Sequence, residues 1–486
     1  MLRGVPRVFL SALAVLSLLA VGYAADSKSA EPPPLSQHFL SRPDLKPPIV
    51  RVRSPAQGTT PGYIFVAPKL RVAQAGPMIL DDRGQVVWFL PVAAKDVADF
   101  RVQRYRGRPV LTWWRGRAPM GVGGGYYSIY DTSYRKIADV RAGNGLNGDL
   151  HEFKITPRNT ALFTVYRLRP QNLSVVRGPK QGKILEGIVQ ERDIATGRVL
   201  FEWHSFPQVG LKESYAKVPP ASQGKKAPPL DYFHINSIEV EPNGKLLVSA
   251  RNTHTIYEID RRTRKVVWRL GGKRSDFKLG PGVRFGWQHD ARRRPDGTIT
   301  LFDNSATPPI AKFSRVLVLH VDEKARKATL VRSYRHPKRL LTPFEGNAQF
   351  LPNGHVFVGW GANPYFTEFD ARGHVLLDAS IGREGAAGKE ADTYRAYRFA
   401  WTGEPTDSPA IVVRRGKIYV SWNGATKVAR WDVVAGSDPQ KLSSMRNVAK
   451  SGFETAIPLQ SKAAYVAVRA LGRDGQVLGR SKTVKR

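Results

Sequence analysis

The sequence contains no cysteine among its 486 residues. The protein can therefore form no disulfide bond, no thiolate metal site and no cysteine nucleophile, and it offers no cysteine for a lipid anchor. Motifs of several enzyme classes are missing as well, since no GxSxG nucleophile elbow and no Walker sequence occurs. HEFKI at His151 lacks the second histidine of HExxH, and GVGGGYY at Gly121 opens no expected helix, so neither run indicates a zinc protease or a dinucleotide loop.

Acidic residues are few beside basic ones: 40 Asp and Glu stand against 76 Lys and Arg, a formal net charge of +36. Such an excess favours anionic partners, namely small anions, envelope polymers or nucleic acid by non-specific attraction. The simplest interpretation is a solvated basic surface, because the arginines are scattered along the chain. No zinc finger, RNP-type motif or long basic helix occurs, so we predict no nucleic-acid role.

Long apolar runs are also absent beyond residues 8–21. Arg3 and Arg7 precede that run and small residues follow it, which is typical of a signal peptide over residues 1–24, cleaved after Ala24 or Ala25. An uncleaved anchor is the alternative, and we expect no other membrane span. The protein should therefore work outside the cytoplasm, where ATP and nicotinamides are poor co-substrates. Residues 25–60 are rich in Pro and Ser and predict an arm or linker.

A repeat dominates the rest of the chain. Aspartate-led turns between apolar stretches recur at intervals of roughly 48 to 67 residues, and a second hairpin type precedes most of them. Aspartate favours turns, and the flanking Val, Ile, Trp and Tyr favour strands. The six runs are ILDDRGQVVWFL, IYDTSYRKIADV, ERDIATGRVLFEW, EIDRRTRKVVWRL, HVDEKARKATLVRSY and EFDARGHVLLDA.

Two hairpins per unit make four antiparallel strands, which is typical of a β-propeller blade. We therefore predict an all-β protein with a six-bladed β-propeller over residues 61–405. The first unit lacks an innermost strand, and residues 394–401 (YRAYRFAW) could supply it and close the ring. A pair of β-sandwiches or a β-helix fits the unit length less well. Residues 406–486 change pattern and predict a small β-sandwich similar to a fibronectin type III module.

Histidines recur at one position of the repeat. His151, His234 and His289 each begin the expected first strand of a unit, in HEFKI, HINSIEV and HDARR. Because first strands line the channel of a propeller, we expect the three imidazoles to converge near its mouth. Alternation along the strands turns Glu152 and Asp290 away from them.

Other polar residues take positions around these histidines. Counting outward from the turn at Pro242-Asn243 pairs His234 with Arg251, and alternation places Asn236 on the same face as His234. Asn347 occupies the corresponding position of the sixth unit.

Several chemistries fit such a cluster. Three imidazoles can bind zinc or iron, but Arg251 beside His234 disfavours a cation, and no carboxylate is expected on the inward face. An arginine with histidines better suits an oxyanion such as sulfate or phosphate. One imidazole can be a nucleophile while a second protonates the leaving group. We therefore expect neither a metal nor a cofactor.

At these residues the sequence resembles the bacterial arylsulfotransferase family. The resemblance spans roughly residues 39–405 and is strongest over residues 231–304. Its runs are DLHEFKITPRNTALFTVY, DYFHINSIEV, LLVSARNTHTIYEID, VVWRLGGKRSDF and QHDARRRPDGTITLFDN, with GPMILDDRGQVVWF and PVLTWW upstream.

The resemblance implies a propeller enzyme that moves a sulfuryl group from a phenolic sulfate donor to a phenol acceptor, without a nucleotide sulfate donor. It also implies a ping-pong cycle in which His289 is transiently sulfated. His151, His234, Asn236 and Arg251 match the positions that hold the sulfuryl oxygens and assist proton transfer. We expect His234 rather than His151 to be the general acid and base, and Asn347 to help bind substrate.

Two other hypotheses remain open at this point. The first is a non-catalytic propeller that binds anionic glycans or envelope polymers through its basic surface. The second is a metal enzyme that uses the three histidines.

Overall fold

The computed structural model describes residues 35–93, 96–119, 121–220, 227–460 and 462–486. The expected signal peptide lies outside these residues. Within them nearly all regular structure is strand, as predicted, and the helical segments are short: η1 (Ser174–Val176), α1 (Ser205–Gln208) and η2 (Leu211–Glu213). No helix in the described ranges is long and apolar enough to cross a membrane.

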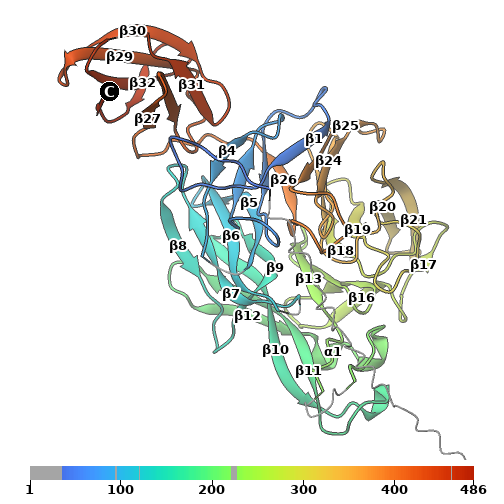
Figure 1. The fold of residues 1–486 in the computed structure, drawn as a ribbon. Coiled ribbons are helices and arrows are strands. Elements are labelled where there is room, and N and C mark those ends of the chain that lie inside the picture. Colours follow the sequence, from blue (N-terminus) through green and yellow to red (C-terminus); the bar gives the residue numbers. More distant parts are fainter. Residues whose placement is uncertain (1–34, 94–95, 120, 221–226, 461) are drawn as a thin grey trace, which may run out of the picture. The chain divides into compact units, whose positions relative to one another are not determined.

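Antiparallel four-stranded meanders follow one another along the chain, and the described residues contain six of them (Figure 1). The first consists of β26 (Ala396–Phe399), β2 (Tyr63–Val66), β3 (Met78–Leu80) and β4 (Val86–Phe89). The second consists of β5 (Asp96–Tyr105), β6 (Arg108–Arg117), β7 (Gly124–Tyr130) and β8 (Lys136–Val140). The third consists of β9 (Gly148–Ile155), β10 (Thr160–Gln171), β11 (Gly182–Asp193) and β12 (Val199–His204). A single pairing between β7 and β9 joins the second and third meanders into one sheet.

The remaining three meanders have the same order of strands. The fourth consists of β13 (Ile235–Val240), β14 (Leu246–Ala250), β15 (Thr255–Ile259) and β16 (Val266–Gly271). The fifth consists of β18 (His289–Arg293), β19 (Ile299–Asp303), β20 (Arg315–Asp322) and β21 (Lys327–Tyr334), with β17 (Lys278–Leu279) parallel to β21. The sixth consists of β22 (Asn347–Phe350), β23 (Val356–Gly359), β24 (Tyr365–Phe369) and β25 (Val375–Ile381).

The aspartate-led turns form as the sequence predicts. Asp81 Oδ1 accepts the backbone N–H groups of Arg83 and Gln85, both at 2.9 Å. Asp131 and Asp370 do the same in the second and sixth meanders, while Asp193, Asp260 and Asp322 each accept a single N–H three residues on. Each turn then passes through one residue with positive φ: Gly84, Tyr134, Gly197, Arg264, Arg326 or Gly373.

The first strands of the meanders contact one another in a cycle: β26, β5, β9, β13, β18, β22 and back to β26. Hydrophobic clusters fill the space between every two neighbouring meanders, including the sixth and the first. Burial of a Val, Leu, Ile or Phe side chain contributes about 1.5–3 kcal/mol, so these clusters stabilise the packing of each meander against the next.

The strand that joins the two ends of this repeat is β26. Its antiparallel pairing with β2, Tyr63 opposite Phe399, confirms that residues 394–401 supply the strand that the first unit lacks. An additional strand lies within the segment expected to be an arm: β1 (Val50–Ser54) pairs antiparallel with β25 at the outer edge of the sixth meander. The composition of this segment did not predict a strand.

The C-terminal strands form two antiparallel sheets that share one core. The first contains β27 (Ala410–Arg414), β28 (Lys417–Ser421) and β31 (Glu454–Pro458). The second contains β29 (Arg430–Asp438), β30 (Lys441–Ala449), β32 (Tyr465–Leu471), β33 (Val477–Arg480) and β34 (Val484–Lys485). Side chains from both sheets, Trp431 and Ile418 among them, form the core. The likeness to a fibronectin type III module stays a prediction, as do the domain boundaries.

Candidate active site

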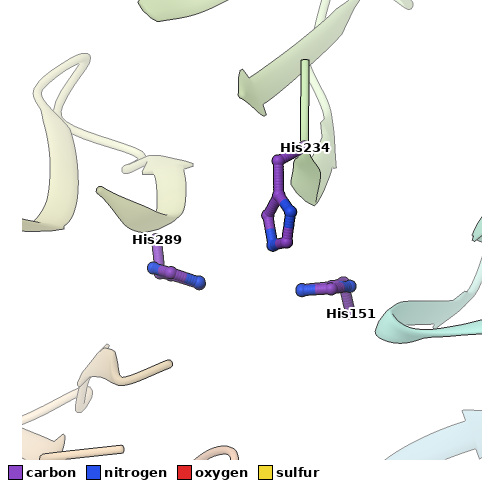
Figure 2. Close-up of side chains that lie close together, drawn as sticks. All are labelled: His151, His234 and His289. Carbon is purple, nitrogen blue, oxygen red and sulfur yellow. The ribbon is translucent and has the colours of Figure 1, made fainter. Parts of the chain in front are cut away.

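Three histidines from consecutive first strands converge, as the alignment of the units predicts. His151 lies in β9, His234 immediately precedes β13 and His289 opens β18. One ring nitrogen from each lies within 4.8 Å of the others, and Figure 2 shows the imidazoles pointing toward one another. The ring centroid of His151 is 4.9 Å from that of His234 and 6.4 Å from that of His289. All three side chains are buried.

A hydrogen bond defines the tautomer of His289. Its Nδ1 lies 2.8 Å from Asn304 Oδ1, while Asn304 Nδ2 donates to the carbonyl oxygens of Thr342 and Glu345. Because these carbonyls fix the orientation of the amide, its oxygen accepts and His289 Nδ1 carries the proton. The lone pair therefore resides on His289 Nε2. Burial, followed by the charge of Arg251, holds the pKa of His289 well below its usual value, so the ring is neutral.

The other two histidines are paired with carboxylates, although no carboxylate was expected on the inward face with them. His151 Nδ1 is 2.6 Å from Asp149 Oδ1, and His234 Nδ1 is hydrogen-bonded to Asp231 Oδ2. Burial opposes ionisation of Asp149, but the charge and hydrogen bond of His151 outweigh it and lower the pKa of that carboxyl. Burial lowers the pKa of His234, although Asp231 opposes the shift. The only signal in the sequence is proximity, since each aspartate lies two or three residues before its histidine.

Arg251 supplies a fixed positive charge beside the histidines. It directly follows β14, and its backbone N–H donates to the carbonyl of His234 at 2.8 Å, which confirms the predicted cross-strand pairing. Its guanidinium donates to Asn252 Oδ1 at 2.8 Å and to the Pro343 carbonyl at 3.2 Å. Burial lowers the pKa of Arg251 to about 10, so the side chain remains cationic at neutral pH.

Aromatic side chains pack against Arg251. Its Cζ lies 4.8 Å from the ring centroid of Trp287, a cation–π contact. Trp287 and His254 pack edge to face, with 4.3 Å between their ring centroids. His254 also stacks on Tyr215, with 4.0 Å between the centroids and 7° between the ring planes. Burial and the charge of Arg251 lower the pKa of His254 to about 3, so it is a neutral packing residue.

A cavity of about 470 Å³ connects these groups and is within the usual size of a small-molecule site. Its mixed lining combines the three histidines and Arg251 with apolar and aromatic side chains and with a second charged group at Lys69. The polar and aromatic residues in the lining include Lys69, Asp96, Trp114, His151, Asp231, His234, Arg251, His289, Phe344, Glu345, Asp392 and Tyr394.

Two residues predicted to bind substrate do not line this cavity. Asn236 Nδ2 donates to the carbonyl of Gln288 at 2.7 Å and so ties β13 to the residue before His289. Asn347 Nδ2 donates to the carbonyl of Ala396, and Asn347 Oδ1 accepts the backbone N–H of Ala396, each at 2.9 Å. Regular alternation is interrupted between His234 and Asn236, because His234 has a φ of 56° and the pairing of β13 with β14 shifts register between Ile235 and Ser237.

Glu152 and Asp290 face away from the histidines, as predicted, and belong to a buried charge network. Glu152 contacts Arg101 at 2.5 Å, Arg292 at 2.6 Å and Arg395 at 3.3 Å. Asp290 contacts Arg292 at 2.6 Å. Burial opposes ionisation of Glu152, but the three arginines outweigh it and hold its pKa well below the usual value. The network links four first strands or the residues beside them.

The histidine cluster also has the spacing of a metal site. Aspartates that accept Nδ1–H of histidine commonly surround zinc sites, so Asp149 and Asp231 are compatible with a metal. Arg251 nevertheless disfavours a metal, because a fixed cation beside the three imidazoles opposes binding of a second cation.

The neutral imidazole, the fixed guanidinium and the two Asp–His pairs define a site for handling an oxyanion, carried on an all-β fold. Residues 101–382 match the family model described as arylsulfotransferase (ASST). The match covers more than half of the chain, and the chain belongs to the arylsulfotransferase family. This confirms the resemblance seen in the sequence.

Other comparisons are more distant. No curated protein matches the chain. A protein of unknown function from Bacteroides caccae is 12% identical, with 70% of this chain and 100% of that chain covered and a TM-score of 0.39. Quinohemoprotein alcohol dehydrogenase from Comamonas testosteroni is 13% identical over 77% of this chain and 72% of that chain, with a TM-score of 0.34. Virginiamycin B lyase from Staphylococcus aureus is 8% identical over 77% and 96%, with a TM-score of 0.33. At such TM-scores these structures do not inform the function of this chain.

Proposed function

We propose that this protein is an aryl-sulfate sulfotransferase that moves a sulfuryl group between phenols through a sulfated His289. The observation that carries the proposal is the hydrogen bond from His289 Nδ1 to Asn304, which leaves the Nε2 lone pair among two further imidazoles. The family supports sulfuryl transfer, and a buried neutral imidazole is a competent nucleophile.

In the first half of the reaction, His289 Nε2 attacks the sulfur of the aryl sulfate. The N–S bond forms as the bond between sulfur and the aryl oxygen breaks, and the electron pair leaves with that oxygen. A protonated histidine gives its proton to the leaving phenolate, which departs as the neutral phenol. In the second half an acceptor phenol returns a proton to that histidine and takes the sulfuryl group, which restores His289.

His234 is the proposed acid and base. Its partner Asp231 lines the cavity and is partly exposed, whereas Asp149, the partner of His151, is fully buried. The Asp231–His234 pair is therefore closer to bulk solvent, with which its proton can exchange. Asp231 would stabilise the imidazolium that forms when the acceptor phenol is deprotonated.

Arg251 is proposed to hold the equatorial sulfuryl oxygens, with His151 as a second donor. Sulfuryl transfer resembles phosphoryl transfer in needing alignment and charge stabilisation more than covalent help. A single well-placed donor contributes on the order of 3 kcal/mol in the transition state. The contacts of Arg251 with Trp287 and Pro343 restrict its position, so little reorganisation is needed when the sulfate arrives.

We further propose that the first strands enclose the channel of a six-bladed propeller. Their cyclic contacts and the hydrophobic clusters between neighbouring meanders support this arrangement. Secretion to the periplasm or cell envelope, and contacts of the basic surface with anionic envelope polymers, are also proposals. The expected signal peptide supports the former and the net charge of +36 the latter.

The test is exchange between an aryl sulfate donor and a second phenol. The wild-type protein should produce the sulfated acceptor with no nucleotide sulfate present, and a chelator should not change the rate. His289→Ala should abolish the exchange, while its thermal unfolding midpoint should stay close to that of the wild type. Exchange at the wild-type rate by His289→Ala would refute the nucleophile assignment, and loss of exchange on chelation would favour a metal enzyme.

A further inference from the structure

A second charged cluster lines the cavity and plays no part in the proposed sulfuryl transfer. Lys69 Nζ lies 2.8 Å from Glu345 Oε1 and 3.0 Å from Asp392 Oδ1. The backbones of Lys69 and Asp392 also exchange two hydrogen bonds, at 3.0 and 3.1 Å. Lys69 and Asp392 lie outside residues 101–382, the part of the chain that matches the family.

The cluster has unused hydrogen-bond acceptors. Within the described part of the chain, Glu345 Oε2 and Asp392 Oδ2 are buried and have no hydrogen-bond partner. Glu345 is 8% exposed and Asp392 is fully buried, and both line the cavity. A buried carboxylate oxygen without a partner is costly, and a hydrogen-bond donor on a ligand would satisfy it.

The charge at this cluster is negative. Asp96 also lines the cavity, so three carboxylates stand against the single ammonium of Lys69. Burial and the repulsion of Glu345 raise the pKa of Asp392 to about 7, against the attraction of Lys69. Even with Asp392 protonated, two carboxylates exceed one ammonium. The cavity therefore combines a cationic region at Arg251 with an anionic region at Glu345.

The segment that carries Glu345 is built into the active site. The carbonyl of Pro343 accepts from Arg251, and the carbonyls of Thr342 and Glu345 hold Asn304, the partner of His289. Glu345 itself has a φ of 66°, a strained conformation for a residue with a side chain. Such strain persists where the surroundings impose it, and it commonly marks functional positions.

We propose that Glu345 and Asp392 determine substrate specificity by accepting hydrogen bonds from a second donor group, a hydroxyl or an ammonium, on the aromatic ring of the phenol. This inference rests on the proposed function. The sulfuryl group would occupy the region of Arg251 and the histidines, with the ring against the aromatic lining. The second donor would then reach the free carboxylate oxygens, and a carboxylate at the same ring position would be repelled.

The experiment compares acceptors that differ only in the group opposite the phenolic hydroxyl. The probes are 4-methylphenol, hydroquinone, 4-(aminomethyl)phenol and 4-hydroxybenzoate, with one aryl sulfate as the common donor. We expect kcat/KM to be about tenfold higher for hydroquinone and 4-(aminomethyl)phenol than for 4-methylphenol, because a hydrogen bond to a charged group is retained. The benzoate should be the poorest acceptor.

Two variants assign the preference to the cluster. Glu345→Gln and Asp392→Asn keep the side-chain shape and an oxygen for Lys69 but remove a charge. In each variant, kcat/KM for 4-(aminomethyl)phenol should fall to within about threefold of that for 4-methylphenol. The advantage of hydroquinone over 4-methylphenol should decrease less. Glu258→Gln is the matched control, because Glu258 is a buried carboxylate of β15 that pairs with Lys245 in the turn between β13 and β14, and it does not line the cavity.

Binding to His289→Ala, measured by calorimetry, separates this inference from the proposed function. If the affinities of the four phenols follow the order expected for kcat/KM, and Glu345→Gln loses this order, the inference is supported even when no exchange is observed. Such binding in a protein that shows no exchange would reject only the proposed function. Equal affinities and equal kcat/KM for the four phenols in the wild-type site, or an unchanged preference in both variants, would overturn the inference.

Discussion

At the scale of single residues, the reactive state of His289 depends on one amide. Asn304 accepts the Nδ1–H of His289 and is itself held by two backbone carbonyls, so its oxygen cannot turn away. In Asn304→Ala the imidazole would lose the bond that fixes its tautomer and its orientation. We predict a fall in kcat of about 10–100-fold with a small change in KM, the effect typical of losing such a supporting partner.

Steady-state kinetics of Asn304→Ala with thermal unfolding measured in parallel check this prediction. A protein that unfolds normally and turns over at the wild-type rate would contradict the role given to Asn304. A large rise in KM with kcat unchanged would do so as well, because it would place Asn304 in substrate binding.

Because His254 is buried and neutral, we expect it to affect the pH dependence of folding stability rather than catalysis. In the unfolded chain its pKa is near 6.5, whereas burial and nearby positive charges lower it to about 3 in the folded protein. Between these values the unfolded chain binds a proton that the folded chain does not, so folding stability falls as pH falls through this window. His254→Phe keeps the stack on Tyr215 and removes this linkage.

The variant His254→Phe should therefore gain stability relative to the wild type at pH 5, by about 1–2 kcal/mol beyond any difference at pH 8. Urea unfolding at the two pH values measures this. An equal difference between the two proteins at pH 5 and pH 8 would show that His254 is protonated to the same extent in both states.

At the scale of elements, the sequence predicts the hairpins well because their turns are local. The aspartates at positions such as Asp81 and Asp370 bond to backbone N–H groups two and four residues on, so each turn is decided within five residues. The pairing of β26 with β2 joins residues far apart in the chain, yet it could be inferred because the first unit lacked a strand.

The side-chain environment of the site was harder to predict, because it depends on where the strands cease to be regular. His234 lies outside β13 with a positive φ, so alternation counted from it does not fix the direction of the Asn236 side chain. Asp231 approaches His234 through the same irregular segment. Glu345 comes from a connection between the fifth and sixth meanders, for which periodicity gives no side-chain direction.

Asn347 gives a test at this scale. Sequence position suggested substrate binding, but its amide donates to and accepts from the backbone of Ala396 and so joins β22 to β26. In Asn347→Ala two buried backbone groups would lose their partner. We predict a loss of about 1–3 kcal/mol in the free energy of unfolding, with KM for donor and acceptor close to wild type.

Urea unfolding and steady-state kinetics of Asn347→Ala decide between the two roles. Unchanged stability combined with a raised KM would restore the substrate-binding role expected from the sequence.

At the scale of the whole molecule, the charge network around Glu152 joins meanders that are distant in sequence. Arg101, Arg292 and Arg395 come from the second, fifth and first meanders or the residue beside them, and all three contact Glu152. Removing its charge would leave three buried guanidinium groups with too little compensation. We predict that Glu152→Gln destabilises the fold by about 3–5 kcal/mol.

The matched control is Glu404→Gln, which removes a carboxylate from an exposed pair with Lys427. Exposed pairs contribute about 0–1 kcal/mol, so this variant should unfold close to the wild type. Equal unfolding midpoints for Glu152→Gln and Glu404→Gln would contradict a central structural role for the network.

The central claim is that His289 carries the sulfuryl group, and mass spectrometry of the protein after incubation with an aryl sulfate tests it most directly. With no acceptor phenol present, a fragment containing His289 should gain the mass of one sulfuryl group, and adding a phenol should remove it. His289→Ala should show no such gain at any other residue. A wild-type protein that transfers sulfate between phenols without ever carrying this mass on His289 would contradict the account.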